Sequence, residues 1–207
     1  MARTLLPAFF ARDPRRVARD LLGKLLVRQS GRKLLVGRIV EVEAYLGTGD
    51  AAAHAASGIT ARNRVLFGPP GRAYVYFIYG NHYCLNVSCQ PEGEAGCVLI
   101  RALEPVEGLE QMARARGLRL PNALTPALRR LTSGPGRLCE AFGITRARDN
   151  GRELTSRSST LRLADDGFRP RRILATPRIG IRKDASKRLR FVITGNPLRR
   201  GFELQSA

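Results

Sequence analysis

The sequence contains no tryptophan, two methionines, four cysteines, and only 17 acidic residues against 36 basic ones. Because no two cysteines form a Cys-x-x-Cys pair, their spacing matches neither a zinc site nor an iron–sulfur cluster, and we expect no bound metal. No apolar run approaches the roughly 20 residues that a membrane span requires, and the apolar stretch at the start is too short for a secretory signal. We therefore expect a protein without a membrane partner that works inside the cell, in the cytoplasm or nucleoid if it is bacterial.

Positive charge is what the sequence has in excess. The formal net charge is +19 and the pI is about 11.3, yet 43% of the residues are hydrophobic, which is enough for a folded core. We expect a single domain over residues 1–207. Only four of the basic residues are lysines; guanidinium groups hold phosphate through paired hydrogen bonds, although codon usage can produce the same bias. The composition predicts a polyanionic partner.

Hydrophobic periodicity and turn residues predict a mixture of helices and strands. The helices are expected at 14–26, 107–117 and 133–142, and the strands at 25–27, 33–36, 38–46, 73–79, 82–90, 97–103, 178–181 and 189–194. Residues 47–70 are rich in glycine, alanine and proline, so we expect a long loop with a short helix near 50–56. Loops of this length are often functional. Residues 146–172 are polar and are expected to be irregular.

Two carboxylates share one face of the strand predicted at 38–46. Alternation places Ile39, Glu41, Glu43 and Tyr45 on this face, and Val40, Val42, Ala44 and Leu46 on the other. In so basic a protein the two glutamates have two interpretations. Either they form ion pairs on a solvated face, or one of them lies in a pocket as a general base beside Tyr45. The spacing alone favours ion pairs.

Tyr79 stands immediately before Gly80 and Asn81, a dipeptide suited to a two-residue hairpin turn of the primed type. A tyrosine at the hairpin tip of a highly basic protein suggests a wedge that enters stacked bases while arginines neutralise the phosphates. Alternatively, Tyr74, Tyr76 and Tyr79 are strand formers with solvated hydroxyls. That alternative does not explain why a tyrosine at a hairpin tip, two carboxylates on one strand and a large positive charge occur in the same protein.

Seven motifs lie along the chain at residues 37–47 (GRIVEVEAYLG), 52–54 (AAH), 62–64 (RNR), 74–80 (YVYFIYG), 83–88 (YCLNVS), 97–105 (CVLIRALEP) and 133–135 (SGP). In order and spacing they resemble the alkyladenine (3-methyladenine) DNA glycosylase family of base-excision repair. The resemblance runs from about residue 7 to residue 196, which is most of the chain.

The resemblance implies roles for individual residues. Glu43 matches the general base of the family, Arg101 the arginine that helps to hold the attacking water, and Tyr79 the residue that fills the gap left by the flipped nucleotide. The residues that match the base pocket are Tyr45, His54 and Tyr76, whose rings enclose the base, and Asn86, which disfavours purines with a 2-amino group. We expect contacts with the DNA backbone from Arg62, Arg64 and Arg137.

The resemblance also implies an α+β fold: a single compact domain, mostly an antiparallel curved β-sheet, with flanking helices and a protruding hairpin. It implies a monofunctional glycosylase that flips alkylated or deaminated purines (3-methyladenine, 7-methylguanine, hypoxanthine, ethenoadenine) out of duplex DNA and excises them by hydrolysis, leaving an abasic site. A lyase would need an amine nucleophile, and none of the four lysines lies beside the Glu43, His54 or Tyr76 motifs. We expect no cofactor, a partner that is double-stranded DNA containing damaged purines, and a monomer.

Other interpretations stay open. A non-catalytic nucleic-acid binding protein explains the charge and the tyrosines but not the combination of Glu43, Tyr45 and Arg101, and replacing Glu43 would then change nothing. A hydrolase of a small substrate would use Glu41 with Glu43, although carboxylates two apart on one strand do not readily act from opposite sides of a bond. The remaining alternatives make His54 a structural core histidine, or a metal ligand together with His82, Cys84 and Cys89.

Overall fold

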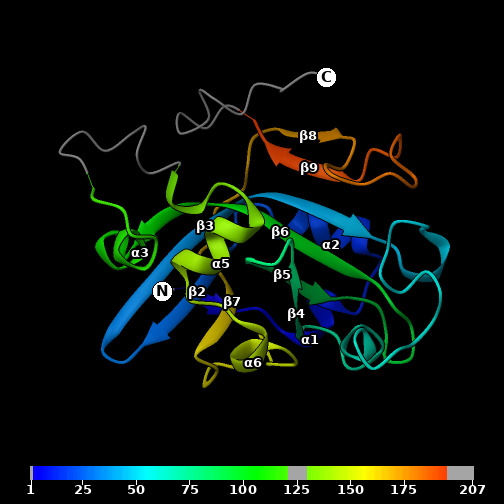
Figure 1. The fold of residues 1–207 in the computed structure, drawn as a ribbon, viewed down its shortest axis with the longest axis horizontal. Coiled ribbons are helices and arrows are strands. Elements are labelled where there is room, and N and C mark those ends of the chain that lie inside the picture. Colours follow the sequence, from blue (N-terminus) through cyan, green and yellow to red (C-terminus); the bar gives the residue numbers. More distant parts are fainter. Residues whose placement is uncertain (1, 121–129, 195–207) are drawn as a thin grey trace.

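A curved antiparallel sheet organises residues 2–120 and 130–194, the part of the chain that the computed structural model describes (Figure 1). Its strands are β1 (Arg3–Thr4), β2 (Leu25–Ser30), β3 (Lys33–Tyr45), β4 (Ala73–Ile78), β5 (His82–Ser88), β6 (Cys97–Glu107), β7 (Leu161–Asp165), β8 (Ile173–Thr176) and β9 (Arg190–Ile193). The order is β1-β7-β2-β3-β6-β5-β4, and β9 joins β8 to β3.

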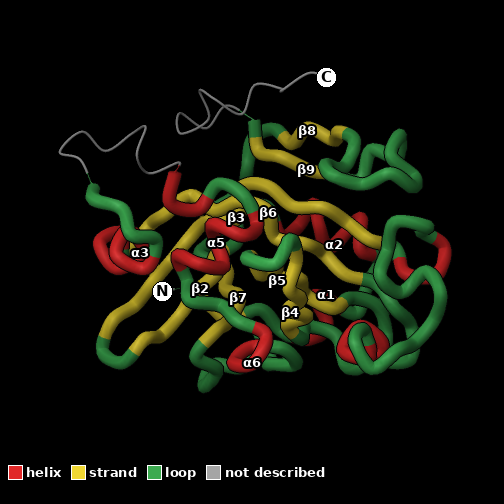
Figure 2. Tube along the Cα trace, viewed as in Figure 1, coloured by secondary structure: helices red, strands yellow, loops and turns green. Residues whose placement is uncertain are grey.

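Short helices flank this sheet (Figure 2). They are α1 (Pro7–Phe10), α2 (Pro14–Leu21), α3 (Leu109–Ala115), α5 (Pro135–Ala141) and α6 (Arg146–Asp149), with 3-10 turns η1 (Gly47–Gly49) and η2 (Arg64–Phe67). Together with the hairpin of β4 and β5, this arrangement confirms the predicted α+β class.

The central strand β3 changes partner halfway along its length. Residues 33–38 pair with β2 and residues 41–43 pair with β9, while β6 runs along the opposite edge. Register shifts between Ile39 and Val42 mark a β-bulge at this change of partner. Ile39 consequently joins Val42 and Ala44 in the main core, so the prediction that Ile39 shares the carboxylate face is wrong.

Helices α2 and α5 supply apolar side chains that cover the sheet. Helix α2 packs against β3 and β6, and α5 packs against β5 and β6. Asp13 caps α2 by accepting a hydrogen bond from the N–H of Arg15, and Pro14 takes the first helical position. The helix ends at Leu21, well before the predicted residue 26, because Gly23 adopts a φ of +86° and turns the chain into β2.

The hairpin predicted at 73–90 is confirmed as β4 and β5. Ile78 pairs with His82, so the loop contains three residues, Tyr79, Gly80 and Asn81, and not the predicted two. Tyr79 and Gly80 have φ angles of +55° and +71°, and the left-handed conformation is rare for an aromatic residue. This loop places Tyr79 at the projecting tip, where it is 79% exposed.

Three other segments differ from the prediction. Residues 50–56 form turns instead of a helix, and residues 178–181 are irregular, since β8 is the strand that pairs with β9. Residues 146–172 contain α6 and β7, and Leu161 and Leu163 of β7 are fully buried. Strand β7 escaped the sequence analysis because Arg162 and Asp165 make a short strand look polar, although alternate residues face the core.

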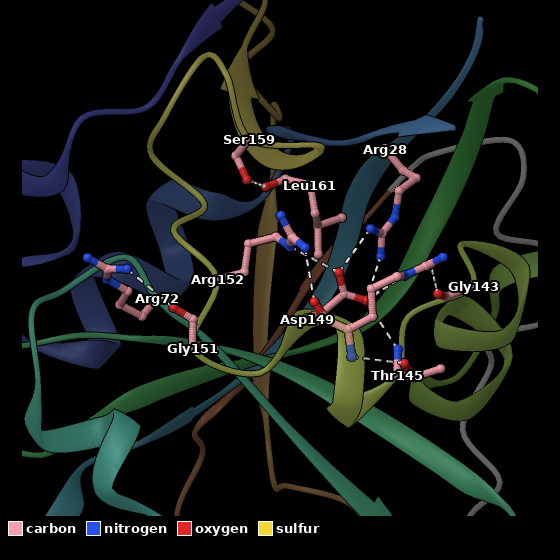
Figure 3. Close-up of polar contacts among 10 residues, drawn as sticks. Arg28, Arg72, Gly143, Thr145, Asp149, Gly151, Arg152, Ser159 and Leu161 are labelled. Carbon is pink, nitrogen blue, oxygen red and sulfur yellow. Dashed lines mark hydrogen bonds and ion pairs between the residues drawn. The ribbon is translucent and has the colours of Figure 1, made fainter. Parts of the chain in front are cut away.

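A buried ion pair attaches α6 to the sheet (Figure 3). Arg28 on β2 donates two hydrogen bonds to Asp149, at 2.9 and 2.7 Å, and the side chains are 3% and 0% exposed. Arg152 donates to the same carboxylate at 3.2 Å. Asn150, the residue after Asp149, accepts a hydrogen bond from the N–H of Val75. The chain after α6 therefore runs along the outer edge of β4. The ion pair thereby supports the strand that carries Tyr74 and Tyr76.

Candidate active site

A cavity of about 500 Å³ opens between the hairpin, the start of α5 and the loop around residue 179. Its size is typical of a site for one small organic group. The predicted site residues that line it are Tyr45, His54, Tyr76, Tyr79, Asn86, Arg101 and Arg137. Arg62 and Arg64 lie outside this lining, in the neighbouring loop.

Glu43 lies directly beneath the floor of the cavity. Its side chain is 0% exposed, and three residues that line the cavity hold its oxygens. The hydroxyl of Tyr45 donates a hydrogen bond to Oε2 at 2.9 Å, and the backbone N–H of Ile179 donates to Oε1 at 2.8 Å. Arg101 Nη1 lies 3.1 Å from Oε1. The carboxylate is therefore fixed in orientation by three residues that line the cavity, although Glu43 itself is not part of the lining.

Glu41, the other carboxylate of the strand, is an ion-pairing residue. Its Oε1 accepts hydrogen bonds from Arg101 Nε and Arg190 Nη1, both at 2.9 Å. Its side chain is 5% exposed. Arg101 thus bridges the two carboxylates, while β9 supplies the second arginine. Glu41 pairs with two arginines, whereas Glu43 shares Arg101 with it and is also bonded by Tyr45 and Ile179, which line the pocket.

The surroundings of Glu43 change its proton affinity. Burial raises the pKa of Glu43 above its ordinary value of 4.5, and the charge of Arg101 opposes this shift only in part. Glu43 therefore takes up a proton at a higher pH than an exposed glutamate does, as suits a general base. Burial and the adjacent Glu43 also raise the pKa of Tyr45, so its phenol stays protonated and donates to the carboxylate.

Aromatic rings form the walls of the cavity. The rings of His54 and Tyr76 lie 4.5 Å apart, and the ring of Tyr74 lies 5.5 Å from that of Tyr76. His54 is exposed to the cavity, and its Nδ1 forms a 2.9 Å hydrogen bond with the Tyr74 hydroxyl, so it is not a core histidine. Burial and the charge of Arg62 lower the pKa of His54, which keeps the ring neutral at pH 7. The sequence analysis did not foresee that Tyr74 orients His54.

Asn86 lies deep in the cavity and is 2% exposed. Its Nδ2 donates to the carbonyl of Tyr74 at 3.2 Å, and its Oδ1 accepts from the Cys97 thiol at 3.8 Å. Burial raises the pKa of Cys97 to about 12, so the thiol keeps its proton. Both ends of the Asn86 amide have partners, and its orientation toward a bound base is therefore fixed.

Exposed arginines lie at the cavity and in the loop beside it. Arg137 on α5 is exposed and lines the mouth. Arg62 and Arg64 are exposed as well, whereas Asn63 between them is buried and donates a hydrogen bond to the carbonyl of His54 at 2.8 Å. The asparagine of this motif is therefore structural. The guanidinium of Arg62 lies 5.8 Å from the centroid of the Tyr76 ring, so this arginine adjoins the wall of the cavity.

Several residues that support the site were missed. Asp50 and Arg178 form a buried ion pair behind Tyr45, and Ile179 supplies the backbone donor to Glu43. No pattern distinguished Asp50 from other polar loop residues, and Arg178 was one more arginine in a segment predicted as a strand.

Metal ligands do not gather at this site. Among residues 2–120 and 130–194, no group of three or more histidines, cysteines and carboxylates could hold a metal ion, so His54, His82, Cys84 and Cys89 do not form the metal site considered above. No lysine lines the cavity in the same described part of the chain. No helix there is long and apolar enough to cross a membrane.

Comparison with known proteins supplies independent evidence. Residues 8–197 match a family model described as "Methylpurine-DNA glycosylase (MPG)". A Koribacter versatilis protein is 60% identical over 190 residues, covering 92% of this chain and 89% of the relative. A Burkholderia cenocepacia protein is 48% identical over 195 residues (93% and 89%), and a Methanocella arvoryzae protein 45% identical over 195 residues (91% and 92%). The names of all three relatives refer to 3-methyladenine DNA glycosylase.

These matches define the class of protein first: the chain is a DNA N-glycosylase, a hydrolase of DNA repair. Within that class, it belongs to the methylpurine-DNA glycosylase family. The family membership inferred from the motifs is thereby confirmed.

Proposed function

We propose that this enzyme rotates an alkylated or deaminated purine out of duplex DNA and hydrolyses its N-glycosidic bond, leaving an abasic site. The observation that carries the proposal is the position of Glu43, a buried carboxylate bonded to Tyr45 and Arg101 beneath an aromatic cavity. A base cannot enter such a cavity without leaving the stack, and the cost of leaving is lowest for damaged or mispaired bases. The enzyme acts inside the cell as a monomer.

Tyr79 fills the gap that the purine leaves in the duplex. It is 79% exposed at the tip of the hairpin, and an aromatic wedge at such a position enters between base steps. The exposed arginines Arg62, Arg64 and Arg137, with the net charge of +19, provide the attraction to phosphate.

The cavity selects the extruded base by its shape and charge. Tyr45, His54 and Tyr76 present aromatic faces, which favour an electron-poor or cationic purine through stacking and cation–π attraction. The neutral ring of His54 does not repel a positively charged base. The fixed amide of Asn86 disfavours a 2-amino group. On this basis we propose as substrates 3-methyladenine, hypoxanthine and ethenoadenine, which carry no 2-amino group, and 7-methylguanine, whose positive charge is attracted to the aromatic walls and offsets the cost of its 2-amino group.

The chemistry is hydrolysis at C1′ of the deoxyribose. Arg101 holds a water, and ionised Glu43 takes a proton from it as the water oxygen forms a bond to C1′. The C1′–N bond breaks, its electron pair leaves with the base, and the Glu43 carboxylate stabilises the positive charge that develops on the sugar. A cationic purine leaves without further protonation, whereas a neutral purine leaves more readily once protonated.

Two alternatives lose support at this site. A lyase step needs an amine nucleophile, and among the described residues no lysine lines the cavity, so we propose a monofunctional enzyme. A hydrolase of small substrates would need Glu41 as its second carboxylate, but Arg101 and Arg190 already hold Glu41 in ion pairs.

Release of damaged bases from labelled duplexes tests the proposal. Duplexes that carry 7-methylguanine, 3-methyladenine, hypoxanthine or ethenoadenine are incubated with the native protein, and abasic sites are read out by alkaline cleavage. We expect alkali-dependent strand breaks, no breaks without alkali, and activity that falls steeply between 50 and 200 mM salt, as phosphate contacts require. If the protein binds all duplexes but releases a base from none, the proposed excision activity is wrong and the protein only binds DNA. Activity that is insensitive to salt would point to a small substrate.

Tyr79→Ala is expected to slow release from duplex DNA roughly tenfold to 100-fold, since aromatic stacking on a base contributes ~1–3 kcal/mol. Release from a single strand, where no gap forms, should change far less. Single-turnover rates on matched duplex and single-stranded substrates measure the difference. Phe77→Ala is the control, because Phe77 lies on the same hairpin and is 45% exposed but is not among the residues that line the cavity. Equal losses in both variants, or on both substrates, would contradict the wedge.

A further inference from the structure

Asp50 and Arg178 form an ion pair that is fully buried behind the cavity. Both side chains are 0% exposed, and both Nη atoms of the guanidinium contact the carboxylate, with an Nη2–Oδ1 distance of 2.7 Å. Nε of Arg178 is buried without a hydrogen-bond partner. Because removing two charges from water is costly, such a pair is weak evidence for stability. Its position suggests another purpose.

Asp50 connects the pair to two segments that carry the site. Its carboxylate accepts hydrogen bonds from the N–H of Leu46, directly after β3, at 3.1 Å and from the N–H of Ala52 at 3.2 Å. The first contact fixes the chain next to Tyr45. The second fixes the turn that leads to His54.

Arg178 connects the pair to the surroundings of Glu43, the proposed general base. Its Nη1 donates to the carbonyl of Ala44 at 3.0 Å, and its guanidinium carbon lies 4.6 Å from the centroid of the Tyr45 ring. Since Arg178 is fully buried and is absent from the cavity lining while Tyr45 is part of it, the guanidinium covers the ring face that points away from the cavity. The following residue is Ile179, whose N–H bonds Glu43.

We propose that Arg178, held by Asp50, is a positioning residue for base excision: it supports the Tyr45 ring from behind and holds Ile179 so that its N–H reaches Glu43. The inference rests on the proposed function, in which ionised Glu43 activates water. Arg178 acts without touching the extruded base. Loss of the Tyr45 or Ile179 donor would leave ionised Glu43 less stabilised, so that the carboxylate would become protonated at a higher pH.

The groups that face Glu43 come from every neighbouring element: Glu41 and Tyr45 on β3, Cys84 on β5, Arg101 on β6, Arg190 on β9, and Arg178 with Ile179 after β8. Arg178 contacts or adjoins the two uncharged donors, Tyr45 and Ile179, whereas Arg101 has its own ion pairs with both glutamates. Because the charge of Arg178 also acts on Glu43, a replacement that keeps this charge is the one whose change in the pH dependence of excision reports these two donors.

Arg178→Lys tests the inference, because lysine keeps the charge but not the paired donors. Single-turnover release of 7-methylguanine is measured against pH, with enzyme in excess and DNA binding measured separately. This base is already cationic, so the acid limb of the profile reports the protein. We expect the rate to fall by up to about 100-fold, the cost of a small misplacement in an active site, and the acid limb to move to higher pH. Asp50→Asn should also slow excision, and a loss greater than that of the control variant decides the question if Arg178→Lys does not fold. Its acid limb carries an opposing effect, because removing the negative charge of Asp50 leaves the charge of Arg178 unpaired near Glu43.

Arg28→Lys is the matched control, because the Arg28–Asp149 pair is equally buried and doubly hydrogen-bonded but lies outside the cavity lining (Figure 3). We expect it to lower stability and, because the pair supports β4, to slow excision far less than Arg178→Lys does, with the acid limb unchanged. The inference is overturned if Arg178→Lys keeps the native excision rate and pH profile, or if its rate falls while the acid limb of the profile stays in place. It is also overturned if the acid limb of Arg28→Lys moves by the same amount. Failure of the native protein to release any lesion would instead overturn the proposed function.

Discussion

Glu43→Gln is expected to reduce base release by about 100-fold to 10,000-fold, the contribution that a general base typically makes. Glutamine keeps the shape of the side chain, and its oxygen can still accept the hydrogen bond from Ile179, but it cannot take a proton from water. Single-turnover release from labelled duplexes, with alkaline cleavage as the readout, measures the loss. Binding to the same duplexes should be kept, because Glu43 is buried beneath the cavity.

The same variant should be at least as stable as the native protein at neutral pH. The pKa of Glu43 is raised in the folded state by burial, so the folded protein binds this proton more readily than the unfolded chain. The native protein therefore loses stability as the pH rises from the ordinary value of 4.5 through the folded value, where a buried charge forms. Glutamine removes this cost. Urea unfolding at several pH values measures the difference.

Glu41→Gln provides the matched control on the same strand. Glu41 balances Arg101 and Arg190, so its loss leaves positive charge uncompensated and should lower stability, with a smaller loss of excision that arises through Arg101. The two variants thus have opposite signatures. Full activity in Glu43→Gln together with inactive Glu41→Gln would show that Glu41, and not Glu43, is the general base.

Local patterns explain what could be predicted from the sequence. Alternation identified the carboxylate strand, and Tyr79 before Gly80 identified the hairpin tip, because both depend on residues that are neighbours in the chain. Spacing alone could not tell Glu41 from Glu43. The distinction comes from Arg190, which pairs with Glu41 from 149 residues further along the chain.

Contacts between distant segments explain what the sequence analysis missed. Asp50 and Arg178 are 128 residues apart, and neither has a neighbour that would mark it as part of a site. The bulge after Ile39 arises where β3 exchanges β2 for β9, so hydrophobic alternation in the strand itself does not reveal it. The loop before β9 was predicted as a strand because Ile179 and Ile181 alternate with small or polar residues, although Ile179 uses its N–H for Glu43 and not for a sheet.

Asp149→Ala is expected to lower the free energy of unfolding by about 3–5 kcal/mol, because it leaves the buried guanidinium of Arg28 without its partner. The loss should also loosen β4, the strand that carries Tyr74 and Tyr76, since α6 supports the edge of β4 through Asn150 and Val75. Amide exchange in β4 should therefore accelerate along with the fall in overall stability. Asp20→Asn is the control, because Asp20 forms an exposed ion pair with Arg12 that contributes little.

The pH dependence of this stability difference has a defined sign. Burial alone would raise the pKa of Asp149, but the hydrogen bonds and charge of Arg28 outweigh it and hold the pKa below its ordinary value of 3.8. A carboxyl with a depressed folded pKa stabilises the protein above its unfolded pKa and loses that contribution as the pH falls through the folded value. The difference between native protein and Asp149→Ala should therefore be constant near neutral pH and shrink below 3.8. Urea unfolding between pH 7 and pH 2.5 measures this difference, and one that grows in acid would contradict the assignment of Asp149 as an ionised partner of Arg28.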